Sequence, residues 1–222
     1  MQIIARIRTP FPTKFGLPRQ SGLAGSLPGR IFFEPAFRQS EAVWGLESYS
    51  HIWLIWQFSE ALRPGWSATV RPPRLGGNTR MGVFATRSPF RPNSIGLSCV
   101  RLDRIIFEEG PVLHVSGADL MDGTPIFDIK PYLPLTDCRP EASVGFAGPA
   151  AEHRLRVIFP EALLALVPEE LRPCLLEVLA QDPRPAYQND PSRRYGFPFA
   201  GLEVRFTVDG AVLTVREVEA AE

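Results

Sequence analysis

One stretch of the chain, residues 71–97, concentrates basic side chains without any acid to neutralise them. It contains five arginines and no Asp or Glu, and the wider span from Arg63 to Arg101 contains seven arginines and again no acid. The formal net charge of the whole chain is zero, so this positive charge is local. Such an imbalance favours an anionic partner whose phosphates are bound by guanidinium groups.

A solvated loop is the alternative interpretation of this stretch. The chain holds 22 Arg and only 2 Lys, which indicates a general preference for Arg over Lys. That preference explains which cation is used, but it does not explain why the acids are missing. Pro and Gly are frequent here, so the chain must turn often and cannot form a long helix.

A second candidate for chemistry is the segment Asp182-Pro183-Arg184-Pro185-Ala186-Tyr187, which follows a predicted helix. Its prolines form a rigid end to that helix, which is a sufficient structural explanation. The segment also resembles, loosely, the Asp-Pro-Pro-Tyr arrangement of amino-methyltransferases. In those enzymes an oxygen accepts a hydrogen bond from the exocyclic amine and an aromatic ring stacks on the base. Asp182 and Tyr187 are therefore the candidate catalytic residues.

Several common kinds of site find no support in the sequence. No G-x-G-x-x-G follows a strand and no Walker motif is present, which argues against a Rossmann or P-loop site. The three His and three Cys are dispersed, so no metal site is predicted. No apolar run approaches the roughly 18 residues of a membrane span, and the N-terminus lacks a signal-peptide pattern.

Residues 1–138 contain many short apolar segments separated by turns and almost no helical pattern. Residues 50–58 form a near-continuous apolar run, which predicts a central strand covered on both faces. The segment Gly82–Arg87 predicts a strand that ends at Arg87, and Asp122-Gly123 predicts a hairpin turn. Many short strands with polar turns are typical of a small antiparallel barrel or sandwich.

The composition changes after residue 138. Residues 139–152 are mostly small and predict a linker. Residues 153–222 combine a strand, two short helices and a hairpin at Asp209-Gly210. The pattern therefore predicts a mainly β protein whose C-terminal part is a small α+β domain.

Several segments, in one order along the chain, resemble the TsaA-like (YaeB, TrmO) family of bacterial S-adenosylmethionine-dependent tRNA adenine-37 N6-methyltransferases. The matching segments are Phe15–Leu23, Gly45–Glu47, Ser50–Trp53, Val70–Leu97, Asp119–Leu133 and Ala180–Tyr187. They extend over most of the chain, which is far more specific than one short motif. The resemblance implies that residues 1–138 form a closed antiparallel β-barrel that binds the cofactor.

The resemblance also implies a binding site for S-adenosylmethionine that needs no Rossmann domain. The cofactor-binding residues it assigns are Ser21, Gly22, Leu23, Glu60, Ala61, Arg87, Leu97, Ile126, Phe127, Asp128 and Ile129. Gly22 lets the backbone approach a ligand closely. Asp128 is either an acceptor for the donor's amino or ribose groups or a solvent-facing strand residue. Arg87 either pairs with a carboxylate or phosphate or forms a surface salt bridge.

The implied reaction is methyl transfer to N6 of adenosine 37, already threonylcarbamoylated, in the anticodon loop of a tRNA. Unpaired loop bases stack on aromatic side chains, for which Phe84, Phe90, Tyr132 and Tyr187 are candidates. The predicted RNA-binding residues are Arg71, Arg74, Arg80, Arg91 and Arg184. A non-enzymatic RNA-binding β-barrel is the alternative, because the arginines alone support it equally well.

The resemblance implies a homodimer as well, which the residues themselves do not show. The absence of targeting and membrane-spanning patterns favours a cytoplasmic protein with no membrane partner.

Overall fold

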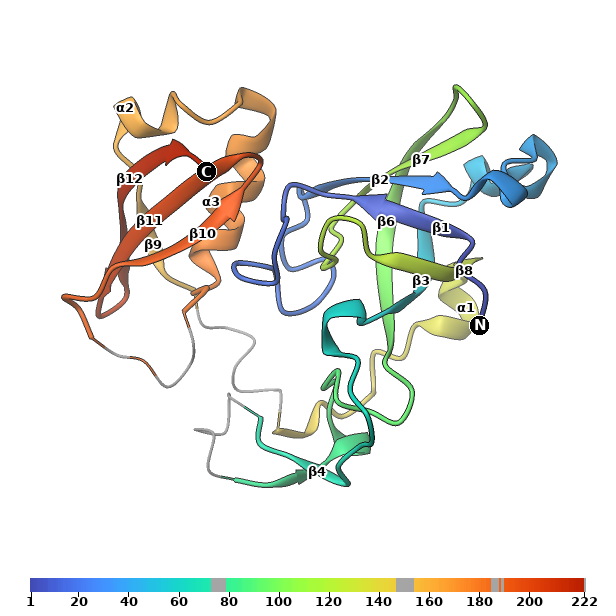
Figure 1. Cartoon of the computed structure of the whole chain (residues 1–222), viewed down its shortest axis with the longest axis horizontal. Coiled ribbons are helices and arrows are strands. Elements are labelled where there is room, and N and C mark those ends of the chain that lie inside the picture. Colours follow the sequence, from blue (N-terminus) through green and yellow to red (C-terminus); the bar gives the residue numbers. More distant parts are fainter. Residues whose placement is uncertain (73–78, 147–153, 185–187, 189, 222) are drawn as a thin grey trace.

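The computed structural model describes residues 1–72, 79–146, 154–184, 188 and 190–221. It contains two lobes, a β-barrel built from the N-terminal half and a smaller α+β lobe at the C-terminal end (Figure 1). The mainly β fold with a closed antiparallel barrel and a small C-terminal α+β part is confirmed.

Six strands close the barrel in the order β1-β2-β7-β6-β3-β8, and every neighbouring pair is antiparallel. The strands are β1 (Ala5–Arg8), β2 (Pro28–Phe33), β3 (His51–Gln57), β6 (Ile95–Phe107), β7 (Pro111–Ser116) and β8 (Pro125–Pro131). The 3₁₀ helices η1 (Pro35–Phe37), η2 (Ser40–Val43) and η3 (Leu46–Ser48) lie between β2 and β3, and helix α1 (Pro134–Asp137) follows β8. Closure leaves no edge strand in the barrel, which removes the need to protect one.

Strand β3 shows how side chains alternate across the barrel wall. Ile52, Leu54 and Trp56 point inward and are at most 6% exposed. Trp53 and Ile55 point outward and are only partly buried. The prediction that both faces of this strand are covered is therefore wrong. The outward-facing apolar residues are only partly covered. One of them, Trp53, donates a hydrogen bond from Nε1 to an Asp137 carboxylate oxygen at 2.8 Å.

The segment between β3 and β6, residues 58–94, leaves the barrel as an excursion that ends in a two-stranded ribbon. The ribbon pairs β4 (Thr69–Val70) with β5 (Met81–Gly82), below the barrel in the view of Figure 1. The strand predicted over residues 82–87 is wrong, because a 3₁₀ helix, η6 (Val83–Ala85), follows β5. The Thr86 hydroxyl and backbone N–H both donate to the carbonyl of Val83, which favours the tight turn over a strand.

The predicted turn at Asp122-Gly123 is present, but it does not join a hairpin. Gly123 has φ +76°, and β8 then pairs with β1 and β3 and not with a strand immediately before the turn. The Asp122 carboxylate accepts hydrogen bonds from the Thr9 N–H and the Arg8 guanidinium, both at 3.0 Å. The turn therefore fastens the end of β1, a long-range contact that a local pattern does not reveal.

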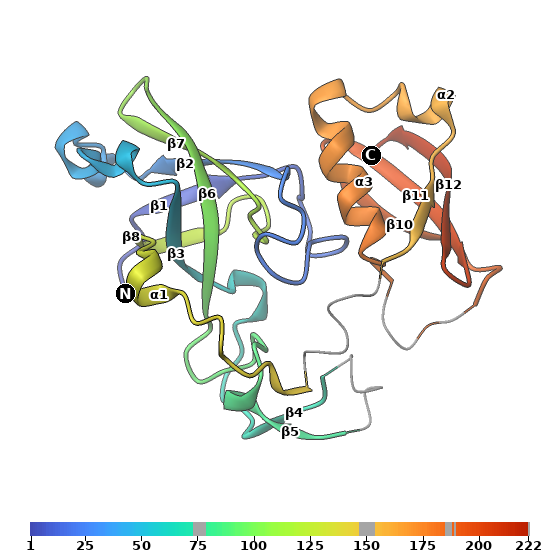
Figure 2. The ribbon, with the colours of Figure 1, turned by 180° about the vertical axis from the view of Figure 1, so that it is seen from behind.

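The C-terminal lobe is a four-stranded sheet in the order β10-β11-β12-β9, with helix α3 against it (Figure 2). Its elements are β9 (Arg156–Ile158), α2 (Glu161–Leu164), η8 (Glu169–Leu171), α3 (Arg172–Ala180), β10 (Tyr195–Phe199), β11 (Leu202–Asp209) and β12 (Val212–Ala220). The predicted hairpin at Asp209-Gly210 is confirmed, since β11 and β12 are antiparallel around it. Strand β9 is parallel to β12. Among the described residues, no helix is long and apolar enough to cross a membrane.

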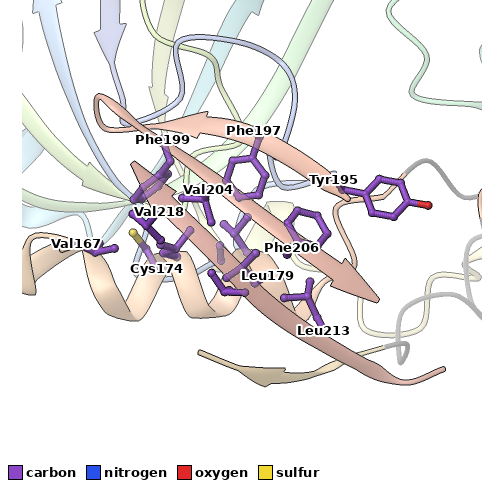
Figure 3. Close-up of a cluster of buried hydrophobic side chains, with 14 of the residues drawn as sticks. Val167, Cys174, Leu179, Tyr195, Phe197, Phe199, Val204, Phe206, Leu213 and Val218 are labelled. Atoms are coloured by element: carbon purple, nitrogen blue, oxygen red, sulfur yellow. The ribbon is translucent and has the colours of Figure 1, made fainter. Parts of the chain in front are cut away.

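The loop between β1 and β2 belongs in part to the core of the C-terminal lobe. Phe11 is fully buried there, with its ring centroid 6.0 Å from that of Phe197 and 5.2 Å from that of Phe199. Ala24 and Leu27 join the same cluster. Figure 3 shows side chains of this cluster between helix α3 and the strands of the lobe, with Phe197 and Phe199 labelled. The predicted linker of residues 139–152 separates the two sheets along the chain, and its residues 147–152 lie outside the described part. The core of the C-terminal lobe is therefore shared between chain segments on both sides of that linker, while the barrel has a separate core of its own.

Candidate functional site

One end of the barrel gathers most of the segments that the sequence singles out. Because neighbouring strands are antiparallel, the ends of β1, β3 and β7 lie beside the starts of β2, β6 and β8. The loop that contains residues 21–23 follows β1, residues 60–61 follow β3, and residue 87 precedes β6. Residues 97 and 126–129 lie near the starts of β6 and β8. The topology thus brings together predicted site segments that are far apart in sequence.

Gly22 fixes the loop of residues 19–23 to the barrel. Its backbone N–H donates to the carbonyl of Gly117 at 2.8 Å, and its φ of +77° lies in the left-handed region that favours glycine. An added Cβ would meet no atom within 4 Å, so the space beside this backbone is open. Ser21 and Leu23 on either side are half-buried. The loop therefore offers anchored backbone groups to a ligand.

Arg87 lies next to this loop. Its side chain is exposed, and Nη1 donates a hydrogen bond to the side-chain oxygen of Gln20. The positive charge of the guanidinium also acts on the partly buried carboxylate of Asp119, whose pKa it lowers. Arg87 thus links the excursion, the 19–23 loop and the barrel at one point.

Asp119 is a candidate site residue that the sequence interpretation did not single out. Its Oδ1 accepts a hydrogen bond from the Ser98 hydroxyl at 2.5 Å, and Ser98 in turn accepts one from Trp56 Nε1 at 2.9 Å inside the barrel. Burial raises the pKa of Asp119, while hydrogen bonds from Ser98 and from the Ser21 backbone and the charge of Arg87 act in the opposite direction. The only signal in the sequence is that Asp119 begins one of the matching segments.

Asp182 and Arg184 form a nearly buried ion pair directly after helix α3. Arg184 Nε and Nη2 donate to the two carboxylate oxygens of Asp182 at 2.7 and 2.8 Å, and the side chains are 9% and 15% exposed. This pairing raises the pKa of Arg184. The predicted phosphate contact by Arg184 is not favoured by this geometry, because its guanidinium is turned into the protein.

Arg19 joins the 182–184 segment to the cofactor loop. Its Nη2 donates to the backbone carbonyls of Asp182 at 3.4 Å and Arg184 at 3.3 Å. The predicted catalytic segment is therefore next to the predicted cofactor loop, although more than 150 residues separate them along the chain. Tyr187, the other predicted catalytic residue, lies outside the described residues, as does Arg74.

Three more predicted cofactor residues lie on strands β6 and β8. Leu97 and Asp128 face outward, whereas Ile129, which is paired with the inward-facing Leu54, packs against the barrel core. Leu97, Ile55 and Asp128 form a row across β6, β3 and β8, since Ile55 is paired with both of the others. Leu97 is 56% exposed. Asp128 forms an exposed ion pair with Lys130 at 3.0 Å, and with Ile129 it borders a hollow of about 620 Å³. Asp128 is thus available to a ligand, although its solvent-facing interpretation is equally compatible with this pair.

A second hollow, of about 820 Å³, opens where β3 ends. Ala61 and Phe127 line it together with Arg91, so predicted cofactor and RNA residues share its wall. Glu60 is exposed beside Ala61 in the 3₁₀ helix η4 (Ser59–Ala61). Ile126 has no exposed surface and belongs to the barrel core, so only its backbone can contribute to a surface site.

The remaining predicted RNA-binding arginines belong to the excursion. Arg71 and Arg80 are exposed beside the β4–β5 ribbon. Arg91 is half-buried, and its Nη1 donates to the carbonyls of Val83 at 3.3 Å and Thr86 at 2.7 Å. Within the described part of the chain, no three His, Cys, Asp or Glu side chains come together in a way that could hold a metal ion.

Comparison with known families accounts for both lobes. The sequence matches the model of the tRNA-methyltransferase O N-terminal domain over residues 6–138 and that of the TrmO C-terminal domain over residues 152–221.

The chain belongs to the tRNA-methyltransferase O family.

Similar full-length proteins agree with this assignment to the TrmO family. A relative in Escherichia coli (strain K12), named tRNA (adenine(37)-N6)-methyltransferase, is 43% identical over 225 residues that cover 97% of this chain and 96% of the relative. A Pseudomonas aeruginosa relative, named putative S-adenosylmethionine-dependent methyltransferase RcsF, is 44% identical over 91% of this chain and 90% of its own length. A crystal structure of TrmO superposes with a TM-score of 0.79 at 37% identity, covering 98% of this chain and 97% of the other. The resemblance of the sequence segments is confirmed.

Proposed function

We propose that this chain transfers a methyl group from S-adenosylmethionine to N6 of adenosine 37 in the anticodon loop of tRNA. The observation that carries the proposal is the junction at Arg19, where the Gly22 loop meets the 182–184 segment at the end of the barrel. The names of the TrmO relatives support the same donor and the same substrate. The prior threonylcarbamoyl group on N6 is part of the proposal.

The residues present fit a sulfonium donor with an amino-acid tail. The open backbone at Gly22 allows close approach, and Arg87 provides a cation for a carboxylate. Asp128 provides an exposed acceptor on the outer wall, across Ile55 from Leu97, and its neighbour in the chain, Phe127, lines the same hollow as Ala61. We assign these residues, with Ser21, Leu23, Glu60, Ile129 and the backbone of Ile126, to the cofactor site.

S-adenosylmethionine, when bound, supplies an electrophilic methyl group. The acceptor nitrogen is a weak nucleophile because its lone pair is delocalised into the purine ring. A new nitrogen–carbon bond forms as the sulfur–carbon bond breaks, and N6 loses its proton. The chain therefore acts mainly by placing the two groups in line and by accepting a proton nearby.

We infer that the 182–184 segment forms one wall of the acceptor site. The paired carboxylate of Asp182 holds the backbone of this segment in position, and Tyr187 a few residues later is the proposed stacking partner of the base. The raised pKa of Asp119 makes it a better proton acceptor than an ordinary carboxylate, and it lies beside Ser21 and Arg87.

We further propose that the excursion binds the RNA backbone. Arg71, Arg80 and Arg91 lie in a span that has no acid, and Arg74 belongs to the same span in sequence. Counterion release makes such binding strongly dependent on salt. A homodimer and a cytoplasmic location, where tRNA is modified, complete the proposal.

Transfer of label from donor to RNA tests the function directly. We expect the purified chain to move a labelled methyl group from S-adenosylmethionine to tRNA that carries threonylcarbamoylated adenosine at position 37, and not to tRNA with guanosine there. The variant Arg87→Ala should bind the donor roughly 10-fold or more weakly, as for loss of a charged hydrogen bond. Arg104→Ala is the matched control, because Arg104 is an exposed arginine further along β6. Equal labelling of both RNAs would contradict the assignment of position 37.

A further inference from the structure

The excursion displays an aromatic surface that the protein core does not use. The rings of Trp66 and Phe84 lie side by side, with centroids 5.9 Å apart and an interplanar angle of 31°. Trp66 is 54% exposed and Phe84 is 70% exposed, so packing within the chain leaves a large part of each side chain open to solvent. Large exposed aromatic side chains that gather at one place mark a binding surface more often than scattered ones do.

Two arginines lie over aromatic rings at the same place. The guanidinium carbon of Arg63 is 4.0 Å from the centroid of the Phe90 ring, and that of Arg91 is 5.7 Å from the centroid of Phe84. Both distances are within the range of a cation–π contact. Aromatic faces and guanidinium planes are thus presented together, which is the combination that binds single-stranded nucleic acid.

Backbone contacts hold this surface in place. Arg91 donates to the carbonyls of Val83 and Thr86, which bracket Phe84 in the chain. The Val83 N–H donates to the carbonyl of Ala68 at 2.9 Å, and the Val83 side chain is only 1% exposed. The buried Val83 side chain anchors the turn. The backbone at Phe84 is therefore fixed, and the Phe84 side chain is directed outward. A platform that is ordered in advance loses less entropy when it binds.

The charge of the surroundings decides the kind of occupant. No carboxylate occurs in sequence between Arg63 and Arg101, which favours attraction of an acidic polymer; the nearest acid along the chain is Glu60, exposed beside Ala61. The same hollow of about 820 Å³ is lined by Arg63, Trp66, Phe90 and Arg91 on one side and by Ala61 and Phe127 on another. The platform therefore adjoins residues of the proposed cofactor site.

We propose that Trp66 and Phe84, with Arg63 and Arg91, form a stacking platform for an unpaired base of the RNA substrate. The occupant is a base next to the methylated one, because the platform adjoins the hollow where Ala61 and Phe127 lie and is separate from the 182–184 segment. The proposal rests on the function proposed above for this site, and it assigns base recognition to Trp66 and Arg63, which the sequence did not single out.

Equilibrium binding of an anticodon stem-loop RNA, measured without methyl donor, tests the platform. Loss of one base–aromatic stack weakens binding by about 1–3 kcal/mol, so Trp66→Ala and Phe84→Ala should each reduce affinity roughly 5- to 150-fold. Trp66→Phe should retain most of the affinity because it keeps a flat ring. Trp44→Ala is the matched control, since Trp44 is 72% exposed but borders the other hollow.

The salt dependence separates stacking from phosphate binding. Trp66→Ala should leave the slope of affinity against salt concentration unchanged, whereas loss of a phosphate contact lowers the slope by about one unit. Donor affinity and the oligomeric state in sedimentation should also be unchanged.

Unaltered RNA affinity in both alanine variants overturns the platform. The platform is also overturned if an alanine variant dissociates into single chains in sedimentation while each chain binds RNA as tightly as before. In that case the rings contact a second copy of the chain. If the alanine variants bind the donor more weakly but bind RNA normally, the surface belongs to the cofactor site and the proposal is overturned. If wild-type protein binds RNA through Trp66 but transfers no methyl group, the platform stands and the proposed enzymatic function fails.

Discussion

Arg184 donates two hydrogen bonds to the carboxylate of Asp182, at 2.7 and 2.8 Å, immediately after helix α3. Asp182 has a positive φ of 55°, an unusual conformation for a residue with a side chain. The ion pair and the two carbonyls held by Arg19 keep this conformation in place. Any effect of changing Asp182 on catalysis therefore includes an effect on the shape of the segment.

A second substitution, at Arg184, should separate the effect of Asp182 on catalysis from its effect on the shape of the segment. Asp182→Ala leaves a nearly buried guanidinium without its carboxylate, so the free energy of unfolding should fall by about 3 kcal/mol and turnover should be lost. The double variant Asp182→Ala with Arg184→Met also removes the unpaired guanidinium charge, so most of the lost free energy of unfolding should be recovered. Recovery of turnover in the double variant would show a positioning role alone, and stable but inactive protein would assign chemistry to Asp182.

The shared core predicts that a barrel loop stabilises the other lobe. Phe11→Ala should lower the free energy of unfolding by about 3–5 kcal/mol, because Phe11 is fully buried against Phe197 and Phe199. Phe15→Ala is the control on the same loop, since Phe15 is 48% exposed, and should cost less than about 1 kcal/mol. Urea unfolding measures both, and equal losses would contradict the shared core.

Gly96 predicts a steric limit at the start of β6. A Cβ at this position would overlap the indole ring of Trp56, which lies inside the barrel and donates to Ser98. Gly96→Ala should therefore destabilise the protein by about 1–3 kcal/mol through overpacking. Gly82 has open space and a negative φ, so Gly82→Ala should be neutral or stabilise by up to about 1 kcal/mol. A thermal melt of each variant distinguishes the two, and matched melting temperatures would refute the overlap.

The raised pKa of Asp119 predicts a pH dependence of stability with a definite sign. A carboxyl group whose pKa is raised by folding binds its proton more tightly in the folded state. Its unfavourable contribution is therefore complete at neutral pH and disappears as the pH falls through the raised value towards 3.8.

Comparison with Asp119→Asn isolates this contribution. The free energy of unfolding of the Asn variant, relative to wild type, should be highest near neutral pH and should decrease as the pH is lowered to about 4. Asp209→Asn, which changes an exposed carboxylate at the β11–β12 turn, is the control. A difference that is constant over this range, or one that grows as the pH falls, would contradict the raised pKa.

Many of the strands could be predicted from short apolar segments and their turns. Residues 50–58 are an example in the barrel and the hairpin at Asp209-Gly210 is one in the C-terminal lobe, since each depends on neighbours in sequence. The segment 82–87 has similar residues, but Thr86 hydrogen-bonds to Val83 and closes a turn. Local side-chain bonds of this kind compete with strand pairing and leave no periodic signal.

The candidate site was predictable only where family motifs mark it. Arg87 and Gly22 belong to such motifs, and the structure places both at one barrel end. The pairing of Asp182 with Arg184 and the hydrogen bond from Ser98 to Asp119 depend on burial and conformation, which residue types do not specify. The contribution of Phe11 to the second lobe is likewise a long-range contact that spacing cannot indicate.

Nucleoside mass spectrometry of position 37 tests the central claim most directly. The tRNA is taken from a strain that lacks its own enzyme of this kind, before and after this chain is expressed there. We predict one added methyl group on the threonylcarbamoylated adenosine at that position, and a smaller methylated fraction when Arg87→Ala is expressed to the same level as the wild-type chain. An unchanged nucleoside 37, in cells that contain folded wild-type protein able to bind S-adenosylmethionine, would contradict the account.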